Sequence, residues 1–394
     1  MVRIVASMLL FLVTLPAFAA TPPAPRDVDI TAPDGVKLKA TYYAAGKPGP
    51  GVLLLHMCNS NRKAWEPVAT QLSAAGINAL ALDYRGYGES EGERIDFRKD
   101  PQKLQQVQNT KWPGDVDAAY AYLLAQPGVN KERIGAGGGS CGVGFAVDVA
   151  RRHSEVKSLA LLAGGANSAG LKFLQHNPWL PIFTAAAADD EFDPNARQNM
   201  QWLSELNGNP RNQFVGFQEG KHGTEIFGPH PELPREIVAW YVQTLVKAPA
   251  DPKAHVAVKK TPAWEFWSLV EQPGGVPKAA QMFHQARKRD PHAFLFPERP
   301  LNLLGYERLQ AKQTKDAVAL FQLNTEAYPN SANAYDSLGD GYAADGQNEK
   351  AIQASQKALE LLPADKGIPE PFKKLVQQNA EGRLQKLKGT AKSW

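Results

Sequence analysis

One glycine-rich segment of the sequence has the residue types and spacing to present a nucleophile. It runs from Arg133 to Gly144 and contains the pattern Gly138-x-Ser140-x-Gly142. Between a strand and a helix, this spacing predicts a nucleophile elbow, a sharp turn that lifts the serine hydroxyl above the sheet. The start of the following helix also favours the negative charge that develops when a carbonyl is attacked. The segment therefore predicts a serine nucleophile at Ser140.

The same glycines allow two other interpretations. Gly137, Gly139 and Gly142 satisfy the G-x-G-x-x-G spacing of a dinucleotide-binding turn. That motif needs an acidic residue about 20 positions further on, whereas residues 157–163 read Lys-Ser-Leu-Ala-Leu-Leu-Ala. The third interpretation is a flexible glycine loop with no chemical role. Because neither glycine motif decides the matter alone, the choice depends on the residues that follow.

A serine nucleophile needs a histidine base, and the base needs a carboxylate that orients it and stabilises its protonated form. Both follow Ser140 in the chain order serine, acid, histidine. Asp190 lies in the segment Asp-Asp-Glu-Phe-Asp-Pro, and His222 lies in Gly-Lys-His-Gly. His230 is the rival base, and Asp189 is the alternative register for the acid. Ser140, Asp190 and His222 are the predicted triad.

The elements around these residues predict a mainly parallel sheet. Short apolar runs rich in Val, Ile and Leu alternate with helix-length amphipathic stretches from residue 27 to about 247. Such a pattern is typical of an α/β fold with helices on both faces of the sheet, where ligands bind at the carboxyl ends of the strands. The expected strands are 36–42, 51–56, 77–83, 133–137, 156–163, 181–185 and 213–217. The expected helices are 65–75, 115–126, 142–153, 196–206 and 234–247.

With this order of residues and elements, residues 27–247 resemble an α/β-hydrolase of the dienelactone hydrolase-like branch. The resemblance implies an α/β-hydrolase fold and a serine hydrolase that cleaves a carboxylic ester or lactone through an acyl-enzyme. It selects Asp190 as the acid because Asp-x-Phe-x-Pro follows from it, and makes Asp189 and Asp193 solvated turn residues. Dienelactone hydrolases proper carry a cysteine nucleophile and a glutamate after the third strand. This sequence has Ser140 and no such acid, so the dienelactone reaction is not transferred.

The resemblance also implies an oxyanion hole of two backbone N–H groups aimed at the developing charge. One belongs to Cys141, and the other to Met57 in the turn after the third strand, with Cys58 as the alternative. Cys141 itself is rejected as the nucleophile, because that frame puts Val143 where a small residue is needed. In an oxidising compartment Cys58 and Cys141 could form a disulfide that closes a loop of about 80 residues. Two buried thiols packed as small apolar groups are the alternative.

The surroundings of the expected site are also constrained. Only about 25 residues separate the expected strand 156–163 from Asp190, so we expect no large cap domain and an open pocket. The resemblance implies that the loop 83–90 helps to build the floor of the site. His56, which ends an expected strand, is predicted to have a structural role.

The sequence changes character after a linker at 248–262 that is rich in Pro, Ala and Lys. Residues 304–329 contain a Leu-Gly pair, a small residue and a closing proline, and this pattern recurs 34 residues later at 338–363. The period resembles the tetratricopeptide repeat. We expect a degenerate leading repeat at 279–291 and a closing helix at about 370–388. Such repeats either pack as plain helix pairs or bind a protein partner, and both possibilities stay open.

The composition of the 394 residues excludes several functions. The chain has 44 Lys+Arg and 40 Asp+Glu, and the excess lies in the tail 366–394, so the body lacks the basic face that nucleic acid requires. The histidines are scattered and no Cys/His spacing suits a metal ion. We expect no cofactor.

The N-terminus predicts export. Arg3 is followed by the apolar run Met8–Leu15 and by Ala17-Phe-Ala, which a signal peptidase recognises. The predicted organisation is a signal peptide at 1–19, a catalytic domain at 20–247, the linker at 248–262, and helical repeats with a capping helix and basic tail at 263–394. No later stretch has the 18 apolar residues of a spanning helix. The mature protein is expected to be periplasmic or secreted, without stable membrane insertion.

Two classes of function follow from these patterns. The first is an exported serine hydrolase acting on a small-molecule ester or lactone, with a peptidase or amidase that uses the same triad as the alternative. The second is a helical-repeat interaction protein whose sheet domain is not catalytic. A complete serine, acid and histidine in the expected order favours the first, because a domain freed from catalysis needs none of the three.

Overall fold

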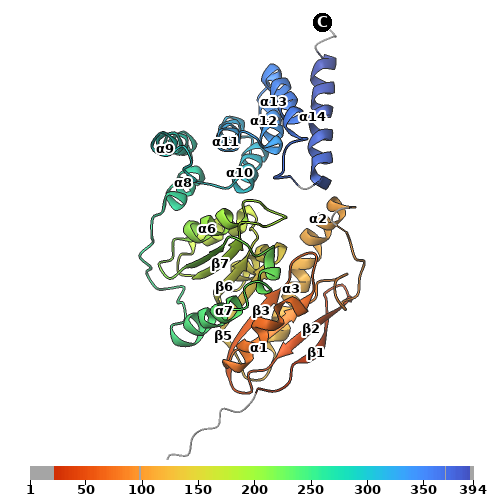
Figure 1. The fold of residues 1–394 in the computed structure, drawn as a ribbon, viewed down its shortest axis with the longest axis vertical. Coiled ribbons are helices and arrows are strands. Elements are labelled where there is room, and N and C mark those ends of the chain that lie inside the picture. The colour runs from red at the N-terminus through yellow and green to blue at the C-terminus, as the bar shows by residue number, and fades with distance from the viewer. Residues whose placement is uncertain (1–21, 97–98, 369, 391–394) are drawn as a thin grey trace, which may run out of the picture.

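A computed structural model describes residues 22–96, 99–368 and 370–390. Its lower part is built around a sheet, and its upper part is a stack of helices (Figure 1). The predicted signal peptide at 1–19 lies outside the described residues. No helix in the described ranges combines the length and apolar character needed to cross a membrane.

The sheet has eight strands in the order β1-β2-β4-β3-β5-β6-β7-β8. β1 and β2 are antiparallel to each other, β2 is antiparallel to β4, and all other neighbours are parallel. The strands are β1 (Arg26–Thr31), β2 (Lys37–Tyr43), β3 (Gly49–Leu55), β4 (Asn78–Leu82), β5 (Val129–Gly139), β6 (Val156–Leu162), β7 (Ile182–Ala187) and β8 (Gln213–Phe217). The predicted mainly parallel sheet is confirmed.

Helices cover both faces of this sheet because alternate strand residues point to opposite sides. Leu53 and Leu55 of β3 join the apolar cluster under α3, α4, α5 and α6, whereas Val52 and Leu54 join the cluster under α1 and α7. The helices of this domain are α1 (Glu66–Ala74), α2 (Pro101–Thr110), α3 (Trp112–Leu124), α4 (Cys141–Arg152), α5 (Ser168–His176), α6 (Ala196–Asn207) and α7 (Leu233–Tyr241), which a π-helical segment (Val242–Lys247) extends. Short 3₁₀ turns lie at Arg62–Trp65 and Gly223–Phe227.

The sequence predicted seven of the eight strands and missed β1, α2 and α5. β1 is an edge strand with one buried residue, Ile30, so it lacks the continuous apolar run of the inner strands. Leu104 is likewise the one buried residue of α2. Weak apolar periodicity explains why β1 and α2 were missed, because periodicity is the main signal from which elements are predicted.

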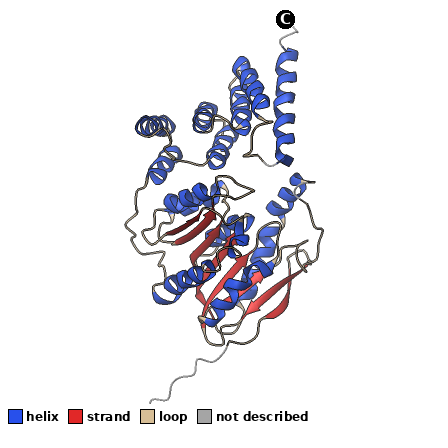
Figure 2. Ribbon diagram, viewed as in Figure 1, coloured by secondary structure: helices blue, strands red, loops and turns tan. Residues whose placement is uncertain are grey.

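The C-terminal part is entirely helical in the described residues (Figure 2). It comprises α8 (Pro262–Glu271), α9 (Val276–Arg289), α10 (Glu298–Gln310), α11 (Thr314–Ala327), α12 (Ala332–Ala344), α13 (Asn348–Leu361) and α14 (Glu370–Thr390). A Cβ at Gly305 or Gly341 would overlap or crowd the ring of Phe321, so these small residues let neighbouring helices approach. The predicted helical region is confirmed, while its identity as tetratricopeptide repeats stays a prediction.

The helical part packs directly on the sheet domain through α6, which faces α8 (Figure 1). Trp202 of α6 meets Trp267 of α8 edge-on, with ring centroids 5.3 Å apart. The indole N–H of Trp202 donates a hydrogen bond of 2.9 Å to the carbonyl of Leu295. Gln175 of α5 adds a polar link, since its amide donates to Ser268 Oγ at 2.8 Å. The two parts therefore share one buried interface.

We expect Trp267→Ala to lower the free energy of unfolding by about 3–5 kcal/mol, because it removes a large buried ring and leaves a cavity between α6 and α8. Urea denaturation followed by far-UV circular dichroism measures this loss. Phe372→Ala is the control: its ring is 41% exposed on α14, and the change should cost less than about 1 kcal/mol. Similar small losses for both variants would show that the interface contributes little.

Candidate active site

Ser140 sits at a strained turn between β5 and α4. Its backbone has φ 53° and ψ −120°, a conformation that residues with a Cβ rarely adopt and that costs about 1–3 kcal/mol. The turn is held by hydrogen bonds from Ser140 N to Leu162 O at 2.8 Å and from Val143 N to Ser140 O at 3.0 Å. The structure thus places Ser140 in the geometry of a nucleophile elbow.

Three glycines make this turn possible. A Cβ at Gly138 would overlap the carbonyl of Gly142, and one at Gly142 would overlap the carbonyl of Leu55. A Cβ at Gly164, in the loop after β6, would overlap the carbonyl of Ser140 itself. The pattern Gly-x-Ser-x-Gly is therefore a packing requirement.

Gly135 and Gly137, which precede the turn, are explained by packing and do not require the dinucleotide-binding interpretation. A Cβ at Gly137 would lie 2.8 Å from the Leu54 side chain and 3.2 Å from the Tyr241 hydroxyl, and one at Gly135 would lie 2.7 Å from the Tyr241 ring. The same hydroxyl donates a hydrogen bond of 2.8 Å to the carbonyl of Ala136. These glycines make room on β5 for α7.

Asp190 and His222 form a buried acid–base pair on the loops after β7 and β8. His222 Nδ1 lies 2.7 Å from Asp190 Oδ2, and the two residues are 7% and 4% exposed. The other carboxylate oxygen accepts hydrogen bonds from the backbone N–H groups of Phe192 at 2.9 Å and Asp193 at 3.0 Å. With Nδ1 directed at the carboxylate, Nε2 is the ring nitrogen that can accept a proton.

The histidine loop lies against the nucleophile turn. A Cβ at Gly223 would lie 3.7 Å from Ser140 N, and a Cβ at Gly139 would lie 3.6 Å from Thr224 N. Within the described residues no hydrogen bond joins Ser140 Oγ to His222. Such bonds are often long before a substrate is bound.

Asp189 has a role that the sequence did not reveal. It is exposed, yet its Oδ1 accepts hydrogen bonds from Gly220 N at 2.8 Å and Lys221 N at 3.2 Å. It therefore ties the acid loop to the histidine loop. Asp189 is therefore an exposed turn residue, as expected, but it also has partners that its sequence neighbours did not indicate.

Asp193 departs from the expectation of a solvated turn residue. It accepts hydrogen bonds from Asn195 N at 2.9 Å and Asn199 Nδ2 at 2.7 Å. Burial raises the pKa of the Asp193 carboxyl. Asp193 is thus half-buried and is tied to the residues at the start of α6.

His230, the rival base, is engaged elsewhere. Its Nε2 lies 2.6 Å from Glu219 O and its Nδ1 lies 3.2 Å from Glu232 Oε1. Its ring stacks on Phe217 with centroids 3.8 Å apart. Because both ring nitrogens are occupied, the geometry favours His222 as the base.

The turn after β3, where an oxyanion donor was predicted, is anchored by His56. This ring is fully buried, its Nδ1 lies 2.7 Å from Met57 O, and its Nε2 accepts a hydrogen bond of 3.2 Å from Tyr84 N. These contacts define a neutral ring protonated at Nδ1. Burial lowers the pKa of His56 to about 4, so the ring stays neutral at physiological pH and has the expected structural place.

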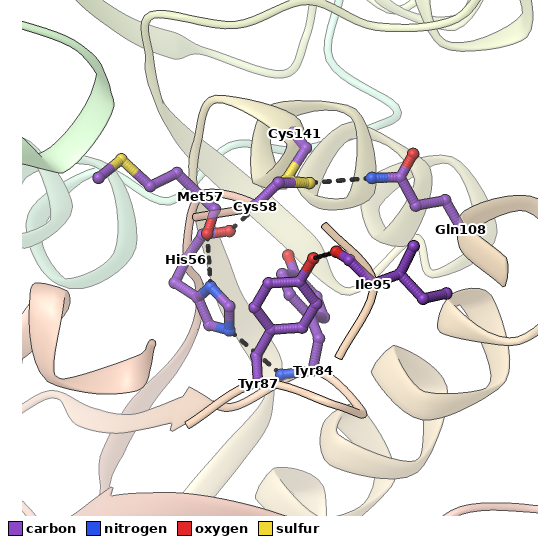
Figure 3. Close-up of a disulfide and its surroundings, with 8 residues drawn as sticks. All are labelled: His56, Met57, Cys58, Tyr84, Tyr87, Ile95, Gln108 and Cys141. Carbon is purple, nitrogen blue, oxygen red and sulfur yellow. Dashed lines mark hydrogen bonds between the residues drawn. A yellow bond between two sulfur atoms is a disulfide. The ribbon is translucent and has the colours of Figure 1, made fainter. Parts of the chain in front are cut away.

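Cys58 and Cys141 are joined by a disulfide in the structure (Figure 3). Their Cα atoms are 5.8 Å apart, a usual separation for such a bond. Of the two alternatives left by the sequence, the structure shows the bond and not two separate thiols. The bond links the turn that contains Met57 to the residue that follows Ser140, so both segments predicted to supply oxyanion donors are covalently connected.

The loop 83–90 is held rigid beside this turn. The buried Asp83 carboxylate accepts from Arg62 twice, with Nη1 at 2.5 Å and the backbone N at 2.6 Å. Tyr84 follows, and its ring centroid lies 4.4 Å from that of His56. The loop thus supports the turn after β3.

The sheet order, the elbow and the acid–base pair define an α/β-hydrolase fold. Residues 38–225 match the family described as "Dienelactone hydrolase family", and this segment is a domain of that family.

Comparison with curated proteins gives partial relatives. An uncharacterized protein of Mycobacterium tuberculosis, found in strains H37Rv and CDC 1551, is 32% identical over 173 residues, which cover 43% of this chain and 55% of that protein. Thiohydrolase aneE of Aspergillus aculeatus is 31% identical over 125 residues, 32% of this chain and 36% of that protein. The chain thus spans about half the length, or less, of these relatives.

Two solved structures resemble part of this chain at low identity. An esterase of Pyrococcus furiosus, Pf2001, has a TM-score of 0.43 and 20% identity and covers 62% of this chain and 98% of its own. Est1E from Butyrivibrio proteoclasticus has a TM-score of 0.45 and 17% identity and covers 56% of this chain and 99% of its own.

The pKa of His56 predicts a pH-dependent contribution to stability. Because the folded-state pKa of about 4 lies below the ordinary value of 6.5, the unfolded chain binds the proton first, and the stabilisation is lost as the pH falls from 6.5 through 4. We expect His56→Asn to destabilise the protein by about 2 kcal/mol more near pH 7.5 than near pH 4.5.

Urea unfolding of the wild type and of His56→Asn at the two pH values measures this difference. The control is His255→Asn, which changes an exposed linker histidine and should show no pH-dependent difference from the wild type. A gap between His56→Asn and the wild type that is equal at both pH values would refute the assignment of a neutral buried ring.

Proposed function

We propose that the chain is an exported serine hydrolase that cleaves a carboxylic ester or lactone through an acyl-enzyme. Ser140 is the nucleophile, His222 the base and Asp190 the acid. The observation that carries the proposal is the 2.7 Å contact of His222 Nδ1 with Asp190, on a loop that lies against the strained Ser140 turn. The dienelactone hydrolase family match over 38–225 supports ester hydrolysis.

Ser140, His222 and Asp190 each have a separate role in the proposed reaction. His222 Nε2 takes the proton of Ser140 Oγ as the oxygen attacks the substrate carbonyl, and the Asp190 carboxylate stabilises the resulting imidazolium. The imidazolium then gives this proton to the leaving alcohol, and the acyl group stays on Ser140. A water molecule, deprotonated by His222, attacks the acyl-enzyme and releases the acid.

The oxyanion of each tetrahedral intermediate is assigned to the backbone N–H groups of Cys141 and Met57. Cys141 is the first residue of α4, where backbone N–H groups have no partner within the helix and the helix dipole favours negative charge. Met57 lies on the turn after β3, which the disulfide fixes beside Cys141. Donors already in place cost no reorganisation when the charge develops.

Export is supported by a second observation. Disulfides persist in oxidising compartments and are rare in the cytosol, and the Cys58–Cys141 bond fits a periplasmic or secreted protein. The signal peptide predicted at 1–19 remains a proposal. The packing of α8 on α6 gives the leading helices a structural role, while a protein partner for the later helices stays a prediction.

We expect Ser140→Ala to lower kcat/KM for ester hydrolysis by about 10⁴-fold or more, because the alkoxide can no longer form. Steady-state kinetics on p-nitrophenyl esters measure this. His230→Gln is the matched control and should keep most of the activity, since His230 contacts Glu219 and Glu232 rather than the triad. Ester hydrolysis at wild-type rate in Ser140→Ala would overturn the proposal.

A substrate panel separates the ester hydrolase from the peptidase or amidase with the same triad. We expect kcat/KM to be at least tenfold higher for p-nitrophenyl esters and lactones than for aminoacyl amides, because an alcohol is the better leaving group. The reverse order would favour the amidase. No turnover on any of them, together with an unreactive Ser140, would favour the interaction protein.

A further inference from the structure

The disulfide occupies a special position relative to the proposed reaction. Cys58 follows Met57 and Cys141 follows Ser140, so each cysteine adjoins a residue of the proposed site, and Cys141 supplies an oxyanion donor itself. The two segments are 83 residues apart in the chain. The bond therefore fixes the distance between two pieces of backbone that must act on one oxygen atom.

The other contacts of the turn after β3 hold its base more firmly than its tip. At the base, Met57 O receives hydrogen bonds from His56 and from Ser60 N at 3.0 Å. The Met57 side chain points at the histidine loop, since a Cβ at Gly223 would lie 2.9 Å from its Sδ. At the tip, the bond to Cys141 is the covalent tie to α4. Loss of the bond would leave the turn folded but its peptide groups free to shift.

The start of α4 is held in a similar way. Gly142 has no room for a Cβ against the carbonyls of Leu55 and His56, so the first turn of the helix touches the end of β3. This contact fixes the helix, but it acts one residue beyond the donor of Cys141. The disulfide acts at the donor residue itself.

The surroundings keep the bond in place while leaving it accessible. Gln108 of α2 points at the disulfide, with Nε2 2.9 Å from Cys58 Sγ (Figure 3). Both cysteines pack on the apolar cluster that contains Tyr84, yet both are only half-buried. Because neither residue is fully buried, we expect a small reductant to reach the bond in the folded protein.

We propose that Cys58 and Cys141 are positioning residues of the hydrolase, whose bond holds the N–H groups of Met57 and Cys141 where the oxyanion forms, so that full catalysis requires the oxidised pair. This inference rests on the proposed function. A dithiol reduces the pair by thiol–disulfide exchange: the S–S bond gains two electrons and two protons and becomes two thiols, and the dithiol becomes a disulfide.

The proposal predicts an effect on kcat rather than on KM. Oxyanion donors act on the tetrahedral intermediate and not on the bound substrate. Loss of one donor in such a site costs about 10²–10³-fold in kcat, and displacement of a donor costs less. We expect reduction to lower kcat at least about tenfold, with KM changed less than about threefold.

The test compares the full-length wild type before and after treatment with dithiothreitol. Alkylation and mass spectrometry establish that both thiols have formed, and near-UV circular dichroism at the assay temperature establishes that the protein is folded. The lower kcat should be restored by reoxidation. Cys58→Ala/Cys141→Ala is the matched control: it should resemble the reduced wild type and should not respond to dithiothreitol.

Two results would overturn the inference. The first is an unchanged kcat in protein whose two thiols are fully alkylated after reduction. The second is a loss of kcat that follows the loss of near-UV signal, which would make the bond a stabiliser of the fold alone. Failure of the proposed function is recognised separately, because the oxidised wild type would then lack Ser140-dependent turnover from the start.

Discussion

The strained backbone of Ser140 is the constraint on which the site depends. Its φ of 53° and ψ of −120° persist only where neighbours leave no alternative. Gly138, Gly142 and Gly164 supply that condition, since each lies too close to another backbone to carry a Cβ. Close approach of this kind requires inner strands fixed by neighbours on both sides, and β3, β5 and β6 are such strands. The parallel sheet therefore provides the fixed inner strands that the strained turn at Ser140 requires.

Hydrogen bonds between the loops after β7 and β8 hold the two loops together beside that turn. Asp190 contacts the His222 ring, and Asp189 accepts hydrogen bonds from the two residues that precede His222 in the chain. These two neighbouring carboxylates therefore fix both the imidazole ring and the backbone that carries it. α6 begins directly after this acid loop and is covered on its outer side by Trp267 of α8. The helical region thus belongs to the same packed structure as Asp190, the proposed acid.

The sequence predicted those features that depend on local pattern. Continuous apolar runs predicted the inner strands, and the order of Ser140, Asp190 and His222 after three of them was enough to propose the triad. Asp189 could not be assigned, because its partners are 31 and 32 residues away and an aspartate in a turn gives the same local signal without them. The interface of α6 with α8 was equally hidden, since an amphipathic helix shows that it has an apolar face but not what covers it. The disulfide remained one of two alternatives until the fold brought the two turns together.

The most direct test of the central claim is the site of covalent labelling by a fluorophosphonate. The account predicts one phosphonyl group per chain, mapped by mass spectrometry to the peptide that contains Ser140, with labelling abolished in Ser140→Ala and strongly slowed in His222→Ala. Absence of labelling in the folded, oxidised protein, or a label that persists at another residue in Ser140→Ala, would contradict it.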